Sequence, residues 1–466
     1  MKRKALALGI ILLLVAAMVF AGGNRAQSGS ETAKSVSGAF DWRRANGAEI
    51  TVYMVQHPTQ ESIMAKLDEF TRLTGIRVRT QVTPEANYFD QVSNGLSSRT
   101  GTPDIFMSGA YMLWDYYSAG NVEPLDDYLN NPALTNRDYD VGDFVQSAFN
   151  ALKWDGVPGN PVGRGAQLGI PVQTELYMLA YNQRAFTKAG ITKPPETYEE
   201  LLAACDKLQG WDGPGTYAVA VRGARDWGTI HPAYMSTFRN FGAKDYEMEG
   251  GRLVSRVNSP ESVRMNEFFV DMIKRGGSPQ WSSMYWYMCM TDFGAGKAAM
   301  LWDASNAAAN CVFANMAEAA NIKYAPMPVA RAGDTRHSNF WTWSLAMNSS
   351  SKNKIAAWLF LQYFSTKEFL ISASVDSDNM DPGRTSVYNN PGFQAKLARL
   401  PGWYDAWQKT VNTTTIQFTP HSAFFAATTE WAATLQDLVA GTRYPNVKAG
   451  LDALKITQDR MLRDLD

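Results

Sequence analysis

Strand-like and helix-like hydrophobic patterns alternate along the first quarter of the chain. Short continuous apolar runs predict buried strands, and apolar residues that repeat at helical spacing predict the helices between them. The expected elements, strand and helix in turn, cover residues 50–55, 63–73, 76–82, 88–98 and 104–107. This β-α-β-α-β order is typical of a parallel sheet with right-handed crossovers and helices on both faces. The sequence therefore predicts an α/β fold.

The ends of these strands indicate where a ligand would bind. In open sheets of this kind, ligands lie beyond the carboxyl ends of the strands. Gln56 and His57 directly follow the first strand, and the segment Ser108–Trp114 follows the third. The aromatic residues Tyr111 and Trp114 of that segment therefore join the first two as candidate ligand-binding residues.

A second αβ pattern begins near Gly169. Thr197 and Glu200 form a capping box, in which the hydroxyl and the carboxylate each accept a bond from a free backbone N–H at a helix start. Further strands are expected over residues 177–181, 298–302, 324–328 and 340–347, and helices over 182–189, 355–364 and 424–439. A mature chain of this length is too long for one core, so two domains are predicted.

The N-terminus has the three parts of a secretory signal. The basic residues Lys2–Lys4 precede an apolar run, Ala5–Phe20, and small residues follow from Ala21. We expect cleavage after Ala21, which makes residues 1–21 a signal peptide and predicts a periplasmic protein. No cysteine follows the run, so a lipobox lipid anchor is not expected. The run is shorter than the roughly 20 residues of a membrane-spanning helix, although its retention as an N-terminal anchor stays open.

Charge and cysteine content exclude several classes of protein. The 44 Lys and Arg residues nearly balance the 45 Asp and Glu residues, which leaves a net charge of -1. No basic block could follow a phosphate backbone, so nucleic acid is not an expected partner. Cys205, Cys289 and Cys311 lack CxxC spacing and indicate no zinc site; one disulfide and buried free thiols fit them equally.

Aromatic residues are unusually frequent, with 14 Trp, 20 Tyr and 22 Phe. Many stand beside Gly, Asn, Asp or His rather than in periodic apolar stripes. Because sugar rings offer flat C–H faces to aromatic rings and hydroxyls to amides and carboxylates, this composition favours a carbohydrate ligand. Ordinary core packing is the alternative for any single ring, since large aromatic residues are mostly buried.

Seven segments, spread over nearly the whole mature chain, follow one family pattern. The most specific is LAYNQRAFTKAGITKPPETYEELL at Leu179–Leu202, with its tyrosine-asparagine, glycine-isoleucine and double-proline pairs before a capped helix. The others are Phe70–Ile76, Gly101–Phe106, Phe293–Asp303, Tyr324–Pro328, Ala356–Glu368 and Pro420–Gly441. In this order and spacing they resemble the bacterial extracellular solute-binding proteins of the carbohydrate type, the relatives of maltose-binding protein.

The resemblance implies a two-lobed periplasmic binding protein fold of type II. Each lobe would be a mostly parallel sheet flanked by helices, with the ligand in the cleft between the lobes. Carried onto this sequence, lobe one comprises residues 47–170 and 304–348, and lobe two comprises residues 171–303 and 349–466. Residues 22–46, which begin with a stretch poor in large apolar side chains, would form a flexible leader.

The function that the resemblance implies is the substrate-binding subunit of an ABC importer. Such a subunit binds a sugar or oligosaccharide and delivers it to the permease transmembrane subunits, and no cofactor or metal is implied. Hinge closure of the lobes around the ligand lets the importer distinguish loaded from empty protein.

Two pairs of residues that contain tryptophan are further candidate ligand-binding residues. Trp302 and Asp303 lie at a predicted crossing between the lobes, where a ring and a carboxylate would meet the ligand. Trp341 and Trp343 alternate on one expected strand and therefore face the same way. Core packing of these rings and solvation of the aspartate remain the alternative.

Loop residues complete the set of candidates. Trp227 and His231 crowd a loop with Gly and Pro and suit a pocket wall, although lone histidines are more often structural. Arg384 follows Asp381 in a segment that resembles a family loop whose arginine reaches the ligand, and a guanidinium can bond two hydroxyls at once. Phe425 stands where the resembled tail carries a stacking aromatic residue.

Two other functions stay open at this point: a sugar sensor for a signalling receptor and a secreted glycosidase. A glycosidase needs two carboxylates about 5 to 10 Å apart across the scissile bond. The sequence offers no paired carboxylate motif, no nucleophile elbow and no metal-ligand cluster. A binding protein rather than an enzyme is therefore expected.

Overall fold

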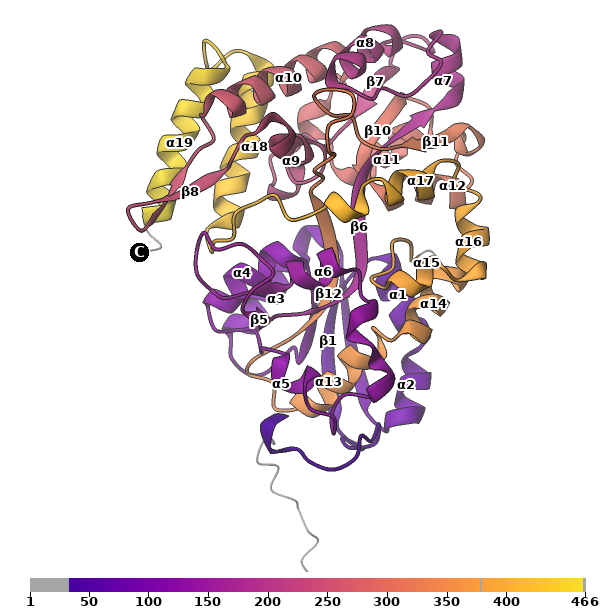
Figure 1. The fold of residues 1–466 in the computed structure, drawn as a ribbon, viewed down its shortest axis with the longest axis vertical. Coiled ribbons are helices and arrows are strands. Elements are labelled where there is room, and N and C mark those ends of the chain that lie inside the picture. The colour runs from indigo at the N-terminus through magenta and orange to yellow at the C-terminus, as the bar shows by residue number, and fades with distance from the viewer. Residues whose placement is uncertain (1–32, 378, 464–466) are drawn as a thin grey trace, which may run out of the picture.

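The computed structural model describes residues 33–377 and 379–463. It shows two lobes connected by long strands, an upper and a lower one as drawn in Figure 1. The expected signal peptide lies outside the described residues, as does the first part of the expected leader. Among the described residues, no helix has the length and apolar character needed to cross a membrane.

One mixed sheet runs through both lobes in the strand order β2-β1-β3-β12-β6-β10-β7, and β11 pairs with β6. Its strands are β1 (Glu49–Val55), β2 (Arg77–Thr83), β3 (Ile105–Ser108), β6 (Ile170–Asn182), β7 (Tyr217–Ala220), β10 (Ala298–Ala304), β11 (Ile322–Ala325) and β12 (Phe340–Met347). β1 is parallel to β2 and β3, and β10 is parallel to β7. β12 and β6 pair antiparallel with their neighbours. The predicted parallel β-α-β-α-β unit is therefore confirmed, at one end of a mixed sheet.

Two short hairpin-like pairs stand apart from this sheet. They are β4 (Lys153–Trp154) with β5 (Ala166–Gln167), and β8 (Tyr246–Glu249) with β9 (Arg252–Ser255).

Helices cover both faces of the sheet in each lobe (Figure 1). Those of the lower lobe are α1 (Pro58–Ala65), α2 (Leu67–Thr74), α3 (Glu85–Ser97), α4 (Ala110–Ser118), α5 (Asp126–Leu129), α6 (Gln146–Ala151), α13 (Lys354–Tyr363), α14 (Lys367–Asp376) and α15 (Thr385–Tyr388). Those of the upper lobe are α7 (Gln183–Lys188), α8 (Tyr198–Leu208), α9 (Ala233–Phe238), α10 (Pro260–Gly276), α11 (Trp286–Gly294), α12 (Ser305–Phe313), α17 (Trp403–Gln408), α18 (Phe424–Ala440) and α19 (Val447–Arg463). α16 (Pro391–Leu397) packs against α14 and α15.

Local sequence signals fix several element ends as predicted. The capping box of α8 is present, since the Glu200 N–H donates to Thr197 Oγ1 and the Thr197 N–H to Glu200 Oε2, each at 3.2 Å. α2 ends at Gly75, whose φ of 73° is accessible to glycine without strain. His57 caps α1, because the Thr59 N–H donates to the His57 Nδ1, and Pro58 occupies the first helical position.

The long strand β6 links the two lobes. Its residues 170–176 pair with β12, and residues 177–182 pair with β10 and β11. All of its residues except Tyr181 are buried. The strand expected over residues 177–181 is therefore only the upper half of a continuous strand that crosses between the lobes (Figure 1).

Contacts place several elements in the opposite lobe from the one expected. α12 and β11, which the sequence boundaries put in lobe one, pack against β10 and the upper half of β6. α13, expected in lobe two, packs against β1 and β12 of the lower lobe. We therefore propose that the chain crosses between the lobes after β11 rather than after β10. The proposed boundary then lies between β11 and β12 instead of at residue 303.

The described part of the expected leader is packed rather than flexible. Ala33 and Val36 are buried, and the Asn131 side-chain amide donates to the carbonyl oxygens of both residues at 2.8 and 2.9 Å. Trp42 also packs edge-on against Tyr363 of α13. The lower lobe thus holds this segment through one bridging amide and a few apolar contacts.

Aromatic residues and all three cysteines contribute to the cores. Trp114 and Trp358 are fully buried in the lower lobe, and Trp302 and Trp431 in the upper lobe. The three cysteine thiols are free and buried. Part of the aromatic excess in the composition is therefore ordinary core.

Candidate functional site

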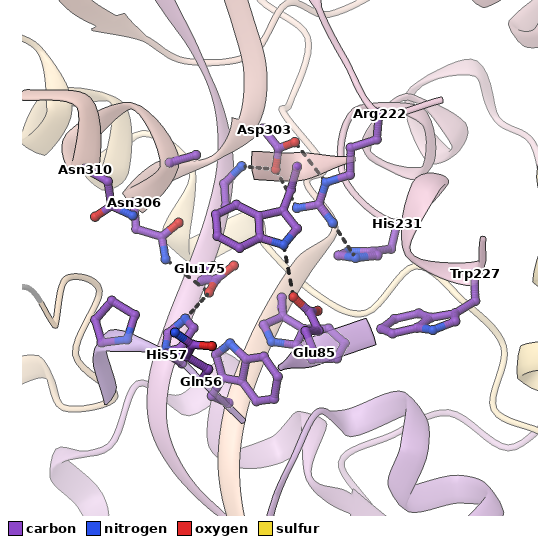
Figure 2. Close-up of a pocket in the computed structure, with 16 residues that line it drawn as sticks. Gln56, His57, Glu85, Glu175, Arg222, Trp227, His231, Asp303, Asn306 and Asn310 are labelled. Atoms are coloured by element: carbon purple, nitrogen blue, oxygen red, sulfur yellow. Dashed lines mark hydrogen bonds and ion pairs between the residues drawn. The ribbon is translucent and has the colours of Figure 1, made fainter. Parts of the chain in front are cut away.

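A pocket lies between the lobes (Figure 2). It encloses about 600 Å³ of empty space, including its open mouth. Its lining combines carboxylates, amides, a guanidinium and aromatic rings, supplied by Gln56, His57, Pro58, Glu85, Glu175, Arg222, Trp227, His231, Trp286, Asp303, Ala304, Asn306, Ala307, Asn310, Trp341 and Trp343.

The lower wall comes from three strands of the lower lobe. Gln56 and His57 occupy the turn between β1 and α1, and Glu85 is the first residue of α3, just after β2. Trp341 and Trp343 alternate on β12 and both reach the pocket. Each position follows from strand geometry, because side chains beyond strand ends converge and alternate residues share a face.

The upper wall begins where β7 and β10 end. Arg222 lies two residues after the end of β7, and Trp227 lies in the same connection further along the chain. Asp303 is on β10, while Asn306 and Asn310 lie one helical turn apart on α12. Residues four apart on a helix share a face, which brings both amides to the pocket.

Arg222 and Asp303 form a buried ion pair in this wall. Arg222 Nη2 lies 2.6 Å from Asp303 Oδ1, and Arg222 Nε lies 2.9 Å from Asp303 Oδ2. Burial alone would lower the pKa of Arg222, but the neighbouring Asp303 carboxylate outweighs it and the pKa is raised. Arg222 Nη1 donates to the Gly228 carbonyl and to His231 Nε2, each at 3.1 Å. The guanidinium is thus permanently charged, and Nε, Nη1 and Nη2 all bond to protein groups.

His231 is neutral behind this pair. Burial and the Arg222 charge hold its pKa well below the usual range. Because its Nε2 accepts from Arg222, the proton sits on Nδ1, which donates to the Tyr177 hydroxyl. His231 therefore links Arg222 to Tyr177 of β6 through hydrogen bonds, and it adds no charge to the pocket.

Glu175 lies on β6 between the two walls, and groups from both lobes bond to it. Asn306 Nδ2 donates to Glu175 Oε1 at 3.1 Å from the upper side. His57 Nε2 lies 3.7 Å from the same oxygen on the lower side. The His57 ring is oriented by its role as helix cap, since its Nδ1 accepts from the Thr59 N–H. Glu175 thus connects both lobes at the strand that links them.

Glu85 makes a contact across the cleft. Trp286 Nε1, from the first residue of α11 in the upper lobe, donates to Glu85 Oε2 at 3.0 Å. Burial raises the pKa of Glu85, and the positive charge of Arg222 only partly opposes that rise. Figure 2 shows the Glu85 carboxylate between the groups of the lower and upper walls.

Aromatic rings of both lobes meet beside these polar groups. Trp341 lies 5.7 Å from Trp227 and 5.4 Å from His231, measured between ring centroids. Trp227 also packs edge-on against Phe89 of α3 at 5.6 Å. Trp343 contacts the His57 ring at 5.4 Å. These rings offer apolar faces next to hydrogen-bonding groups, which is the usual composition of a small-molecule pocket.

Most of the residues predicted from the sequence line this pocket, namely Gln56, His57, Trp227, His231, Asp303, Trp341 and Trp343. Tyr111 and Trp114 lie behind it, where both rings pack on Phe424 of the upper lobe. The Tyr111 hydroxyl donates to the Phe340 carbonyl at 3.0 Å. Phe425 lies edge-on to Trp227 at 5.5 Å and supports that ring.

Trp302 and Arg384 are placed away from the pocket. Neighbouring residues of a strand face opposite sides, so Asp303 reaches the pocket while Trp302 is buried near Tyr198. Arg384 is fully buried, and its guanidinium donates to the carbonyl oxygens of Ser365, Tyr139 and Asp140 at 2.7 to 2.8 Å. Both side chains have structural surroundings, which differ from the ligand contacts expected for them.

Sequence reasoning missed several lining residues, chiefly Glu85, Glu175, Arg222, Trp286, Asn306 and Asn310. The strand-end rule that indicated Gln56 applies equally to Glu85 after β2 and to Arg222 after β7. Asn306 and Asn310 have helical spacing just after β10. Glu175 and Trp286 carry no local signal, because only the folded chain shows that they face the pocket.

Comparison with known proteins gives consistent matches. The model of the family described as bacterial extracellular solute-binding protein matches residues 56–369. The erythritol/L-threitol-binding protein of Mycolicibacterium smegmatis is 36% identical over 411 residues, which cover 88% of this chain and 85% of that protein.

Solved structures share the fold at lower sequence identity. The solute-binding protein of Agrobacterium vitis S4 with bound D-mannitol has a TM-score of 0.74 and 23% identity, over 90% of this chain and 99% of that chain. The solute-binding protein of Agrobacterium radiobacter K84 in complex with ribitol has a TM-score of 0.75 and 19% identity, over 90% and 99%. These likenesses confirm the two-lobed α/β fold.

Proposed function

Because the chain belongs to the family of bacterial extracellular solute-binding proteins, we propose that it is the substrate-binding subunit of an ABC importer for a short acyclic polyol. One observation carries the proposal: carboxylate, amide and guanidinium groups from both lobes converge with tryptophan rings in one pocket between the lobes. A ligand held there contacts both lobes at once and stabilises their closed arrangement.

The chemistry of the pocket suits a polyol. Every carbon of a polyol carries a hydroxyl, which both donates and accepts hydrogen bonds. Glu85 and Glu175 can accept from such hydroxyls, and the amides of Gln56 and Asn310 can donate or accept. The tryptophan faces can pack against the C–H groups of the carbon chain.

The size of the pocket and the ligands of similar proteins favour an acyclic ligand over an oligosaccharide. The Trp286–Glu85 hydrogen bond connects the two walls of a pocket with about 600 Å³ of empty space, including its open mouth. The relative with 36% identity is an erythritol/L-threitol-binding protein, and two of the structural neighbours hold mannitol and ribitol. In place of the sugar or oligosaccharide expected from the sequence, we therefore propose a sugar alcohol of the size of erythritol to mannitol.

The pocket is proposed to bind its ligand without catalysis. Asp303 is engaged by Arg222, and Glu175 accepts from Asn306, so these carboxylates are arranged to hold hydroxyls rather than to exchange protons with a leaving group. Export to the periplasm through residues 1–21 and delivery to the permease transmembrane subunits complete the proposed role.

Calorimetric titration of the purified mature protein tests this function. Erythritol, ribitol and mannitol represent the polyols, and glucose and maltose represent the sugars. We expect single-site binding of at least one polyol with a Kd below about 10 µM, together with a change in tryptophan fluorescence on closure. Tighter binding of maltose than of every polyol, or the release of glucose from maltose, contradicts the proposal.

A further inference from the structure

The pocket carries more negative than positive charge. Glu85, Glu175 and Asp303 all line it, and Arg222 is its permanently charged cation. Arg222 bonds Asp303 at two points and directs its remaining donor to Gly228 and His231. His231 is neutral. The charges of Glu85 and Glu175 are thus left without a matching guanidinium or ammonium among the lining residues.

Glu85 differs from Glu175 in its partners. Glu175 lies on the connecting strand β6; the Asn306 amide donates to it, and the His57 ring lies 3.7 Å from the same oxygen. Glu85 has one neutral donor, the Trp286 indole, and this donor belongs to the opposite lobe. When the lobes separate about β6, the Trp286–Glu85 bond must break, and water reaches the Glu85 carboxylate.

We propose that Glu85 and Trp286 form a latch that is made when the lobes close on the ligand, and that Glu85 takes up one proton from solvent as the latch is made. The inference rests on the proposed function, because it names a proton as a second ligand of the same pocket. The Glu85 carboxyl then accepts from Trp286 at one oxygen and donates the new proton from the other oxygen to a ligand hydroxyl.

The groups that face Glu85 come from every wall of the pocket. His57 follows β1, Glu175 stands on β6, Arg222 follows β7 and Asp303 stands on β10. Of these, Arg222 and His57 favour the charged form of Glu85, and Glu175 opposes it. Burial has the largest effect, and it raises the pKa of Glu85. An uncharged ligand replaces water around the carboxylate without supplying a positive charge, so closure on a polyol favours the protonated form.

The expected pH dependence follows from linkage. Under this proposal, solvent around Glu85 in the open cleft removes the effect of burial that raises its pKa in the closed form, so the closed form binds more protons. Ligand affinity is therefore highest at acidic pH and falls as pH rises between the two pKa values, by at most about tenfold per pH unit. Above the raised value, affinity is lower and constant.

Calorimetry in pairs of buffers with different ionisation enthalpies measures the number of protons bound per ligand. The probe is the polyol that binds best in the titration above, tested from about pH 4.5 to 8. We expect uptake that approaches one proton at the pH between the two pKa values. Glu85→Gln keeps an oxygen acceptor for Trp286 and should bind the polyol with no proton uptake and with a flat pH profile.

Two further variants separate the latch from the fold. Trp286→Phe removes the indole donor, and we expect it to weaken polyol binding by about tenfold while unfolding as the wild type does. Glu61→Gln alters an exposed glutamate in the first turn of α1, and it should keep the proton uptake of the wild type. Proton uptake that persists in Glu85→Gln, or its absence from the wild type across the whole pH range, overturns the proposal. Failure of every polyol to bind at any pH instead overturns the proposed function.

Discussion

The Arg222 guanidinium holds the Asp303 carboxylate at two points, through bonds of 2.6 and 2.9 Å. The two side chains come from neighbouring parallel strands and are nearly enclosed, with exposed fractions of 11% and 1%. An enclosed pair of this kind depends on both partners, because removal of one leaves an uncompensated charge in a medium that solvates it poorly.

Asp303→Asn is expected to lower the free energy of unfolding by about 3 kcal/mol. The asparagine keeps the size of the aspartate but leaves the Arg222 charge unpaired beside neutral His231. Urea denaturation followed by circular dichroism measures this change.

A matched control uses an exposed ion pair of the same lobe. Asp212 accepts from Lys188 and Arg184, and all three side chains are more than one-third exposed. Asp212→Asn should leave the free energy of unfolding close to that of the wild type, because water screens an exposed ion pair. If the two substitutions lowered the free energy of unfolding equally, the enclosure of the Arg222–Asp303 pair would make no difference to stability.

Trp227→Ala is expected to weaken polyol binding by tenfold or more, about 1.4 kcal/mol. The ring comes from the upper lobe and packs on Phe89 and Trp341 of the lower lobe, so its contacts favour the closed arrangement. Calorimetric titration measures the affinity. Trp42→Ala, which removes a partly buried tryptophan beside Tyr363 far from the pocket, should leave the affinity unchanged.

The fold could be predicted wherever a segment carries its own strong pattern. β12 spans the expected residues 340–347, and α18 ends within one residue of its prediction. β6 is longer than predicted, because its first half is ordered by pairing with β12, far away in sequence. Lobe membership depends in the same way on long-range packing, and the lobe boundaries that we propose differ from the expected ones at α12 and α13 for that reason.

The candidate site could be predicted only where chain geometry decides the direction of a side chain. Gln56 and His57 follow a strand end, and Trp341 and Trp343 alternate on one strand, so their convergence follows from local rules. The choice between Trp302 and Asp303 depends on which face of β10 points to the pocket. The sequence does not reveal that, because both neighbours of β10 are distant in the chain.

Arg384→Lys separates a structural role from a ligand-binding one. The buried guanidinium donates to three backbone carbonyls that join the segment 139–140 to α15 and the end of α13, and an ammonium group cannot reach all of them. We expect the free energy of unfolding to fall by about 3 kcal/mol. The protein that stays folded should bind the polyol with the affinity of the wild type, as measured by calorimetry. If the variant instead lost its affinity for the polyol but kept the stability of the wild type, Arg384 would have the ligand-binding role expected from the sequence.

His421→Phe is expected to make the protein more resistant to acid. His421 is buried edge-on against Tyr246, and burial lowers its pKa to about 4. In the unfolded chain the imidazole titrates near its usual value, so the unfolded state binds more protons over the interval between the two values. The free energy of unfolding of the wild type therefore falls as pH decreases through that interval, by about 3 kcal/mol in total.

A phenylalanine side chain keeps a ring against Tyr246 and binds no proton, so the substitution removes this one contribution while all other groups titrate as before. Urea denaturation of both proteins at about pH 7.5 and pH 4.5 gives the loss of unfolding free energy for each. The difference between the two losses is the contribution of His421. The wild type should lose about 3 kcal/mol more than His421→Phe between these two pH values. Parallel losses in the two proteins would mean that His421 is protonated in the folded state, and hence that water reaches its ring.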